Sequence, residues 1–296
     1  MATAASRAGV RRNREPDLSA EEGTVFWQSA LLEDVYFFKA RFRTHSYSRH
    51  THARYAVGAV ESGAQTYWCR GERQTASSGW LSFINPEEPH DGRSASGEWY
   101  CYRMLYIGPA HFSRAVGEIT GRDHGEGDFL PLFRQAAARD EELAPRLLAF
   151  HRDLETDEIS ALEAESVLMQ LLLTAVRRHA SYPPGALRRG RHSALVRQVS
   201  DYLRENLSGN PTLSDLARLT GLTRFHLLRQ FNRDTGMAPH TYLTQLRLRR
   251  AQQLLRAGEP AAEVAAATGF VDQSHLNKRF RAAYGLTPLQ FLRGCR

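Results

Sequence analysis

Lysine is nearly absent from this chain of 296 residues, which has only Lys39 and Lys278. Cysteine is also scarce: Cys69, Cys101 and Cys295 are an odd number of residues without metal-ligand spacing. This pattern argues against a disulfide framework and a zinc module, and it fits a reducing cytoplasm. No uncharged apolar run approaches the roughly 18 residues that cross a bilayer, which argues against a membrane-spanning protein.

The first residues also lack the apolar run of a secretory signal. Their small residues and arginines predict a disordered tail over residues 1–22. The whole chain is 42% hydrophobic and 24% charged, which is typical of a globular protein and excludes disorder throughout. Its length is sufficient for two domains of ordinary size.

The net charge of +7 is unevenly distributed along the chain. Residues 193–296 contain 15 Lys/Arg against 7 Asp/Glu, whereas the remaining residues contain 24 against 25. A segment of one charge sign attracts a polyanion such as DNA. Genomic composition also enriches arginine, so the charge is only supporting evidence for DNA binding.

Residues 23 to about 108 contain short runs of Val, Tyr, Trp and Phe broken by glycines, which predicts a small β-barrel or jelly roll. Alternation is clearest over residues 99–106. There, a period of two places Trp99, Cys101 and Arg103 on one face and the tyrosines with Met104 on the other. We expect one of these faces to be the barrel interior.

The apolar period becomes helical after about residue 130, which predicts two amphipathic helices within residues 139–180. Their leucine stripes suit packing against a second subunit, and they equally suit covering the open end of the barrel. Residues 181–192 combine a Pro-Pro-Gly breaker with a basic run that has no apolar period. We predict a flexible interdomain linker there.

An internal repeat in the last hundred residues is the most specific feature of the sequence. The two copies span residues 212–236 and 260–285, and the second has one additional residue in its turn. Each copy is predicted to be a helix, a turn and a second helix. Gly221 and Gly269 can adopt the left-handed conformation that ends the first helix.

The second helix of each copy has one apolar stripe and one polar face. Leu227 with Phe231, and Leu276 with Phe280, are predicted to face the first helix. The opposite face therefore turns outward. It carries arginine, which suits guanine, and glutamine and asparagine, which suit adenine. This arrangement is typical of a helix-turn-helix motif.

The helix predicted between the copies covers residues 239–257. At ~1.5 Å per residue it spans about 28 Å, which approaches the ~34 Å between successive major-groove faces of B-DNA. Both motifs could therefore contact one side of a modestly bent duplex. Arg247, Arg249 and Arg250 on this helix are predicted to contact DNA phosphates or to remain solvated.

These motifs resemble the AraC/XylS family of bacterial transcription regulators over about residues 199–292. The matching residues are Ala217, Gly221, Leu227, Phe231, Gly236, Pro239, Ala265, Gly269, Phe270, Leu276, Phe280, Gly285, Pro288 and Phe291. The resemblance implies base contacts by Arg224, Phe225, Leu228, Arg229, Gln273, Ser274, His275, Asn277 and Lys278. Because Leu228 replaces a polar residue of some members, readout by the first copy is expected to depend on Arg229 and DNA shape.

The segment from His50 to His52, residues 79–86 and His90 resemble the two halves of a cupin barrel, the fold of the arabinose-sensor branch of the same family. A metal-binding cupin also uses a glutamate shortly after the first histidines, and Glu61 lies beyond that place. We therefore expect histidines that line a pocket, with no metal and no cofactor.

The candidate effector-binding residues of the barrel are His50, His52, Tyr67, Trp80, His90, Cys101 and Arg103. A polar ligand in an aromatic cavity needs a few well-placed hydrogen-bonding groups. Barrel core is an equally good interpretation of the aromatic residues and of Cys101. Arg103 either faces inward, where it needs an anionic or hydroxyl-rich partner, or lies on the surface.

These observations predict an α+β protein with four parts after the tail. They are a cupin-like effector-binding barrel (23–112), a helical dimerisation region (113–180), a linker (181–192) and a double helix-turn-helix domain (193–296). The resemblance implies a homodimer.

We predict a sequence-specific transcription regulator, not an enzyme, that is controlled by a sugar or a small polar or anionic effector. Its expected partners are an operator in double-stranded DNA and RNA polymerase, in the bacterial cytoplasm and on the nucleoid when bound to DNA. The resemblance favours activation. The alternatives are a metal-dependent cupin enzyme fused to a DNA-binding module, and a DNA-binding protein without an effector.

Overall fold

The computed structural model describes residues 21–121, 130–156, 159–181 and 193–295. The predicted tail and linker therefore lie almost entirely outside the described residues.

The N-terminal part contains β1 (Gly23–Gln28), β2 (Val35–Phe42), β3 (Ser46–His50), β4 (Tyr55–Ser62), β5 (Ala64–Cys69), β6 (Glu72–Ser77), β7 (Trp80–Ile84), β8 (His90–Ser94), β9 (Tyr100–Ile107), α1 (Pro109–Thr120), β10 (Leu132–Phe133), β11 (Ala137–Arg139), α2 (Leu143–Thr156), α3 (Ala161–His179) and β12 (Ala180–Ser181).

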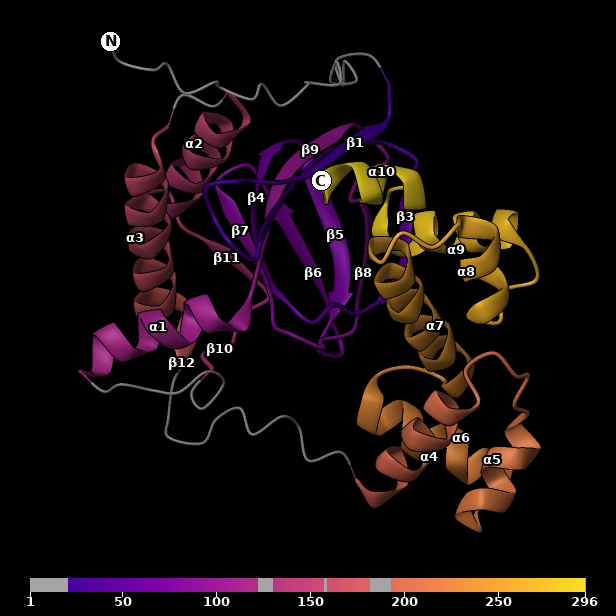
Figure 1. Ribbon diagram of the computed structural model, residues 1–296. Coiled ribbons are helices and arrows are strands. Elements are labelled where there is room, and N and C mark those ends of the chain that lie inside the picture. The colour runs from indigo at the N-terminus through magenta and orange to yellow at the C-terminus, as the bar shows by residue number, and fades with distance from the viewer. Residues whose placement is uncertain (1–20, 122–129, 157–158, 182–192, 296) are drawn as a thin grey trace.

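The C-terminal part is helical. It contains α4 (Ala194–Glu205), α5 (Leu213–Thr220), α6 (Arg224–Thr235), α7 (Pro239–Arg256), α8 (Ala261–Ala267), α9 (Gln273–Tyr284) and α10 (Pro288–Gly294). Helices α5 and α6 form the first predicted motif, α8 and α9 form the second, and α7 connects them (Figure 1). The predicted α+β class and the two helix-turn-helix motifs are confirmed.

Two antiparallel sheets build the barrel. The larger has the strand order β1-β2-β9-β4-β7-β11, and the smaller has the order β3-β8-β5-β6. Helices α1, α2 and α3 lie on one side of the barrel, and the C-terminal helices lie on the other (Figure 1). Because the larger sheet has a helical layer outside it and the barrel interior on its other face, both of its faces are buried.

The alternation predicted for β9 separates these two environments. Leu105 and Ile107 join a core with α1, α2 and α3, whereas Tyr100, Tyr102 and Met104 face the barrel interior. Both faces of the strand are therefore apolar for most of their length. The sequence showed two faces, and the structure identifies the tyrosine face as the interior.

The leucine stripes of α2 and α3 pack within the chain. Leu147, Phe150, Leu168 and Leu172 are all at most 3% exposed in the core that covers the larger sheet. The predicted dimerisation surface therefore cannot be these stripes, because they are already buried. Helix α1 was missed by the sequence analysis, and it contributes the fully buried Phe112 to the same core.

The two DNA-binding motifs are packed differently. Phe231 of the first motif lies in a core formed by α4 to α7 alone. Phe280 and Phe291 of the second motif share a core with barrel residues such as Phe38 and Tyr102. The second motif is thus continuous with the barrel interior, whereas the first has a core of its own.

This difference predicts different effects of equivalent truncations. Phe231→Ala and Phe280→Ala each create a cavity at a fully buried position and should cost about 3 to 5 kcal/mol of local stability. Hydrogen exchange measured by mass spectrometry should show faster exchange only in α4 to α7 for Phe231→Ala. For Phe280→Ala the faster exchange should extend into the barrel strands.

The exposed Leu289, at 57% exposure, provides the control, since Leu289→Ala should leave exchange unchanged in both regions. Barrel exchange that is equally fast in Phe231→Ala and Phe280→Ala would contradict the shared core.

Candidate functional site

Local capping fixes the start of each recognition helix, α6 and α9. The Thr223 side chain accepts a hydrogen bond from the His226 amide, and the Asp272 carboxylate accepts one from the His275 amide at 2.7 Å. Gly221 ends the preceding helix of the first motif with φ of 69°. These contacts satisfy amide groups that helix ends leave free and orient the first turn of each helix outward.

The predicted base-contacting residues occupy the outward faces of α6 and α9. Arg224, Phe225, Arg229, Gln273, Ser274 and Lys278 are exposed, whereas Leu228, His275 and Asn277 are half-buried. Within the described part of the chain, Arg224, Arg229 and Lys278 make no ion pair with a carboxylate. Their charges are therefore available to a polyanion. Phe225 is 68% exposed, which is unusual for a large apolar side chain on an uncomplexed surface.

Helix α7 holds the two recognition helices apart. It has 18 residues and at ~1.5 Å per residue is about 27 Å long, close to the length expected. Its arginines have three different environments. Arg247 donates from Nε to the Leu207 carbonyl at 2.9 Å, Arg249 pairs with Glu87 of the barrel, and Arg250 is exposed.

The sequence predicts that all three arginines contact phosphates or remain solvated, whereas the structure gives Arg247 and Arg249 partners within the chain. The guanidinium of Arg247 supports the loop between α4 and α5, since it also donates to the Gly209 carbonyl at 2.5 Å. Arg249 faces the barrel, where it donates to Thr51 Oγ1 as well as to Glu87. Only Arg250 remains on the open side of α7, so it is the candidate phosphate contact.

The barrel contacts both recognition helices at their C-terminal ends. An Arg49 guanidinium N–H donates to the Gly236 carbonyl at 2.8 Å, and the Thr24 hydroxyl donates to the Gly285 carbonyl at 3.3 Å. Gly236 and Gly285 occupy equivalent positions of the two repeats, as the C-caps of α6 and α9. The barrel therefore holds the same point of both motifs while their first turns face outward.

A cavity of about 270 Å³ lies between the barrel and the C-terminal helices, and we call it the interdomain cavity. It is lined by Phe26, Tyr36, Phe38, His50, Thr51, His52, Ala53, Arg54 and Tyr106 of the barrel and by Arg249, Gln252, Gln253, Arg256, Tyr284, Leu286 and Phe291 of the C-terminal helices. A smaller cavity of about 50 Å³ inside the barrel shares His50 and Tyr106 with it. Predicted residues Tyr67 and His90 line this smaller cavity.

The three predicted histidines lie together where the two cavities meet. The ring centroid of His90 is 4.2 Å from that of His50 and 4.9 Å from that of His52. Burial lowers the pKa of all three imidazoles, and the charge of a neighbouring histidine acts in the same direction on His50 and His52. The cluster is therefore neutral at ordinary pH. Within the described residues, no group of three His, Cys, Asp or Glu residues is arranged to hold a metal ion.

Trp80, Cys101 and Arg103 do not line these cavities. Trp80 packs against the barrel core, and Cys101 is a half-buried free thiol. The prediction that they bind an effector has no support in the geometry. Arg103 requires a larger correction, because it lies on the opposite face of β9 from Tyr102 and Tyr106.

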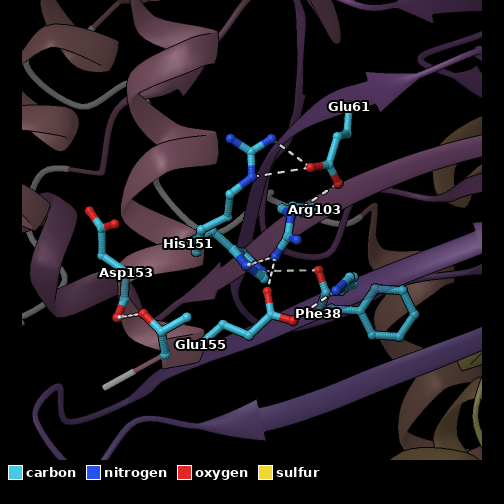
Figure 2. A network of polar contacts seen from close by, with 9 residues as sticks. Phe38, Glu61, Arg103, His151, Asp153 and Glu155 are labelled. Atoms are coloured by element: carbon cyan, nitrogen blue, oxygen red, sulfur yellow. Dashed lines mark hydrogen bonds and ion pairs between the residues drawn. The ribbon is translucent and has the colours of Figure 1, made fainter. Parts of the chain in front are cut away.

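Arg103 is the centre of a polar network under α2 (Figure 2). Its guanidinium pairs with Glu61 at 3.1 Å and with Glu155. It also donates to Nδ1 of His151 at 3.0 Å, while His151 Nε2 donates to the Phe38 carbonyl at 3.2 Å. The buried charge is thus neutralised by protein carboxylates, so Arg103 fixes α2 on the sheet and does not contact a ligand in the cavity.

Several cavity residues were not predicted from the sequence. Tyr284, Arg256 and Gln252 belong to the DNA-binding domain, and Arg54 and Tyr36 carry no motif. Their position depends on how the two domains pack, which local periodicity does not specify. Aromatic residues near the end of the second repeat, such as Tyr284, were the only feature of the sequence that could have indicated this cavity.

Comparisons with known proteins agree with this division of the chain. An AraC-like ligand binding domain matches residues 34–172, and a helix-turn-helix domain matches residues 216–294. The chain is similar to the HTH-type transcriptional regulator YbfI of Bacillus subtilis (strain 168), with 33% identity over 256 residues that cover 86% of this chain and 90% of that relative.

It is also similar to the HTH-type transcriptional activator RhaS of Pectobacterium atrosepticum, with 26% identity over 82% of this chain and 86% of that relative. Among solved structures, apo ToxT from Vibrio cholerae strain SCE256 matches with a TM-score of 0.52 and 12% identity, over 88% of this chain and 98% of that chain. This last likeness concerns the fold alone. Among the described helices, none combines the length and the apolar character of a membrane-spanning segment.

The Arg103 network generates a prediction about stability. The Arg103 side chain is 6% exposed and that of Glu155 is 11% exposed, so Arg103→Ala leaves a carboxylate with incomplete pairing in a buried place. We expect a loss of about 3 kcal/mol in the free energy of unfolding, measured by urea denaturation of the full chain. Arg139→Ala should cost under about 0.5 kcal/mol, because the Arg139–Glu141 pair is exposed. Equal losses in the two variants would contradict the structural role of Arg103.

The neutral histidines generate a prediction about pH. Burial lowers the pKa of His50, His52 and His90 below 6.5, and it lowers the pKa of His151 to about 3. In the unfolded chain these imidazoles bind protons near pH 6.5, whereas in the folded chain they do not. Stability should therefore fall as pH decreases below about 6.5, by up to about 1.4 kcal/mol per pH unit for each histidine.

Thermal unfolding of the full chain between pH 7.5 and 5 measures this slope. His50→Gln removes one of these titrating groups and should make the slope shallower. The matched control is His240→Gln at an exposed position, which should leave the slope as in the parent chain. A slope that His50→Gln does not reduce would show that His50 is not buried in its neutral form.

Proposed function

Because this chain belongs to the AraC family of transcription regulators, we propose that a small effector in the interdomain cavity controls how its two helix-turn-helix motifs are presented to DNA. The contact of the barrel with both recognition helices carries this proposal. Arg49 and Thr24 hold the C-cap carbonyls of α6 and α9, respectively. A small displacement of the barrel strands would therefore act on both helices at equivalent points.

The position of the cavity supports the same control. One wall belongs to the barrel, and the other belongs to α7, α9 and α10. A ligand that prefers one arrangement of these walls must shift the population toward that arrangement. The proposed effector site thus lies between the barrel and the C-terminal helices, whereas the sequence predicts a site inside the barrel.

DNA recognition is proposed to use both motifs on one side of the duplex. The exposed first halves of α6 and α9 would enter successive major grooves, with Arg229 and Gln273 as base-reading side chains. The length of α7 is shorter than the ~34 Å groove spacing, which favours an operator that bends toward the protein. Arg250 would add a phosphate contact that is common to all sequences.

Relatives that are named as transcriptional activators support activation by this chain as well. We propose that activation uses a contact with RNA polymerase. We also propose a homodimer in the bacterial cytoplasm, bound to nucleoid DNA, because two linked copies bind paired half-sites more tightly than one. The outer face of α3 suits this contact, since Leu162 there is 77% exposed. The buried stripes of α2 and α3 do not contribute to it.

The two alternative functions have less support. A metal-dependent enzyme needs a ligand set, and the cavity histidines are not accompanied by a carboxylate in metal-binding geometry among the described residues. A DNA-binding protein without an effector needs no cavity between its domains. We therefore propose that the chain has no enzymatic activity of its own.

Operator selection from random DNA, followed by fluorescence anisotropy at fixed salt, tests the DNA-binding part. Arg229→Ala should weaken binding to the selected operator by about 1 to 3 kcal/mol and relax the preference at one base pair. Arg250→Ala should weaken operator and random DNA equally and should reduce the salt slope by about one.

Arg139→Ala, in the barrel, is the control and should bind as the parent chain does. Two results would contradict the proposal. One is a selection that yields no common sequence, and the other is an Arg229→Ala variant that weakens operator and random DNA to the same extent.

A further inference from the structure

The interdomain cavity has positive charge without matching negative charge on its walls. Arg54, Arg249 and Arg256 line it, and no Asp or Glu is among its lining residues. Arg54 pairs with Asp34 and Arg249 with Glu87, both outside the lining. The second interdomain cavity, of about 280 Å³, differs because Glu87, Glu88 and Asp234 lie in its walls.

Arg256 differs from Arg54 and Arg249 in its partners. Its guanidinium carbon lies 5.2 Å from the Tyr36 ring centroid and 5.0 Å from that of Phe291. Within the described ranges it has no carboxylate partner. Its side chain also forms a hydrogen bond with Cys295. A guanidinium that aromatic rings hold in place, without a carboxylate partner, is well suited to bind a carboxylate.

The histidines supply acceptors. Nδ1 of His50 donates to the Ser48 carbonyl at 2.9 Å, and Nδ1 of His52 donates to the Arg54 carbonyl at 2.6 Å. His90 repeats this pattern with the Glu88 carbonyl at 2.9 Å. A carbonyl oxygen only accepts, so each Nδ1 carries the proton and each neutral ring has an unprotonated Nε2. Each of these Nε2 atoms can therefore accept a hydrogen bond from a ligand.

Two buried atoms on the cavity residues lack any hydrogen-bond partner among the described residues. They are Nε2 of His52, an acceptor, and Nε of Arg249, a donor. The two groups are close enough that the charge of Arg249 contributes to the lowered pKa of His52. Unpaired buried polar atoms are costly, so their presence indicates a missing partner. A hydroxyl group fits both atoms, because it donates one hydrogen bond and accepts others.

We propose that the interdomain cavity binds an organic carboxylate that carries at least one hydroxyl group on a ring. The hydroxyl lies between His52 and Arg249, the carboxylate pairs with Arg256, and the ring packs against the aromatic wall. That wall consists of Phe26, Tyr36, Phe38, Tyr106, Tyr284 and Phe291. This assignment rests on the proposed function, since it names the chemical class of the effector.

Such a ligand contacts both domains at once. His52 belongs to the barrel, whereas Arg249 and Arg256 belong to α7. Arg249 also forms the ion pair with Glu87 that joins α7 to the barrel. A hydroxyl bound at Arg249 Nε is therefore adjacent to one of the contacts that join the barrel to the DNA-binding helices.

Isothermal titration calorimetry on the full chain with matched compounds tests the class. The probes are 3,4-dihydroxybenzoate, benzoate without the hydroxyls, and catechol without the carboxylate. The cyclic hydroxy acid quinate and the neutral sugar glucose form a second set. A hydroxy acid should bind at least tenfold more tightly than the analogue that lacks either group, because each loss leaves buried polar atoms unpaired.

Variants assign the two groups of the ligand. Arg256→Gln, at an exposed position, should remove the preference for the acid over its neutral analogue. His52→Phe should keep that preference and lose the one for the hydroxyl. The control is Arg293→Gln, on an exposed residue of α10 that does not line the cavity, and it should bind as the parent chain does.

Tighter binding of a neutral compound or of Zn²⁺ alone, or no binding of either hydroxy acid, overturns the proposed ligand class. Operator affinity measured with and without each bound compound tests effector control separately. A neutral ligand that changes operator affinity overturns the ligand class and retains effector control. A hydroxy acid that binds without changing operator affinity retains the ligand class and overturns effector control.

Discussion

The structure depends on one shared hydrophobic core, in which the barrel interior is completed by the second helix-turn-helix motif. Phe38 and Tyr102 of the barrel pack in the same core as Leu248, Phe280 and Phe291 of the C-terminal helices. Close-packed interiors transmit displacements instead of absorbing them. The position of α9 is therefore coupled to the barrel directly, and coupling does not require transmission through residues 182–192.

The helical repeat could be predicted because its determinants are local. Caps such as Thr223 and Asp272, glycine C-caps, and the Leu–Phe stripes lie within one or two turns of the residues they control. The faces of the larger sheet could not be assigned in the same way. The alternation of side chains along β9 showed that Arg103 and Tyr102 point in opposite directions. Which of these directions is the barrel interior depends on where α2 packs.

The candidate site illustrates the same limit. The histidines at 50, 52 and 90 carried a recognisable pattern, and the structure brings them together. Arg249 and Arg256 carried none, because a basic helix beside a DNA-binding motif predicts phosphate contacts. Only the packing of α7 against the barrel shows that these two arginines face a cavity and that Arg250 faces away from it.

Helix α7 therefore takes part in both proposed activities, effector binding and DNA binding. Its cavity side carries Arg249 and Arg256, its open side carries Arg250, and its length sets the separation of α6 and α9. A ligand that changes operator affinity by some factor must have its own affinity changed by operator DNA by the same factor. Since the Arg249–Glu87 pair joins a cavity-lining residue of α7 to the barrel, this coupling can originate in a single ion pair whose geometry differs between the two states.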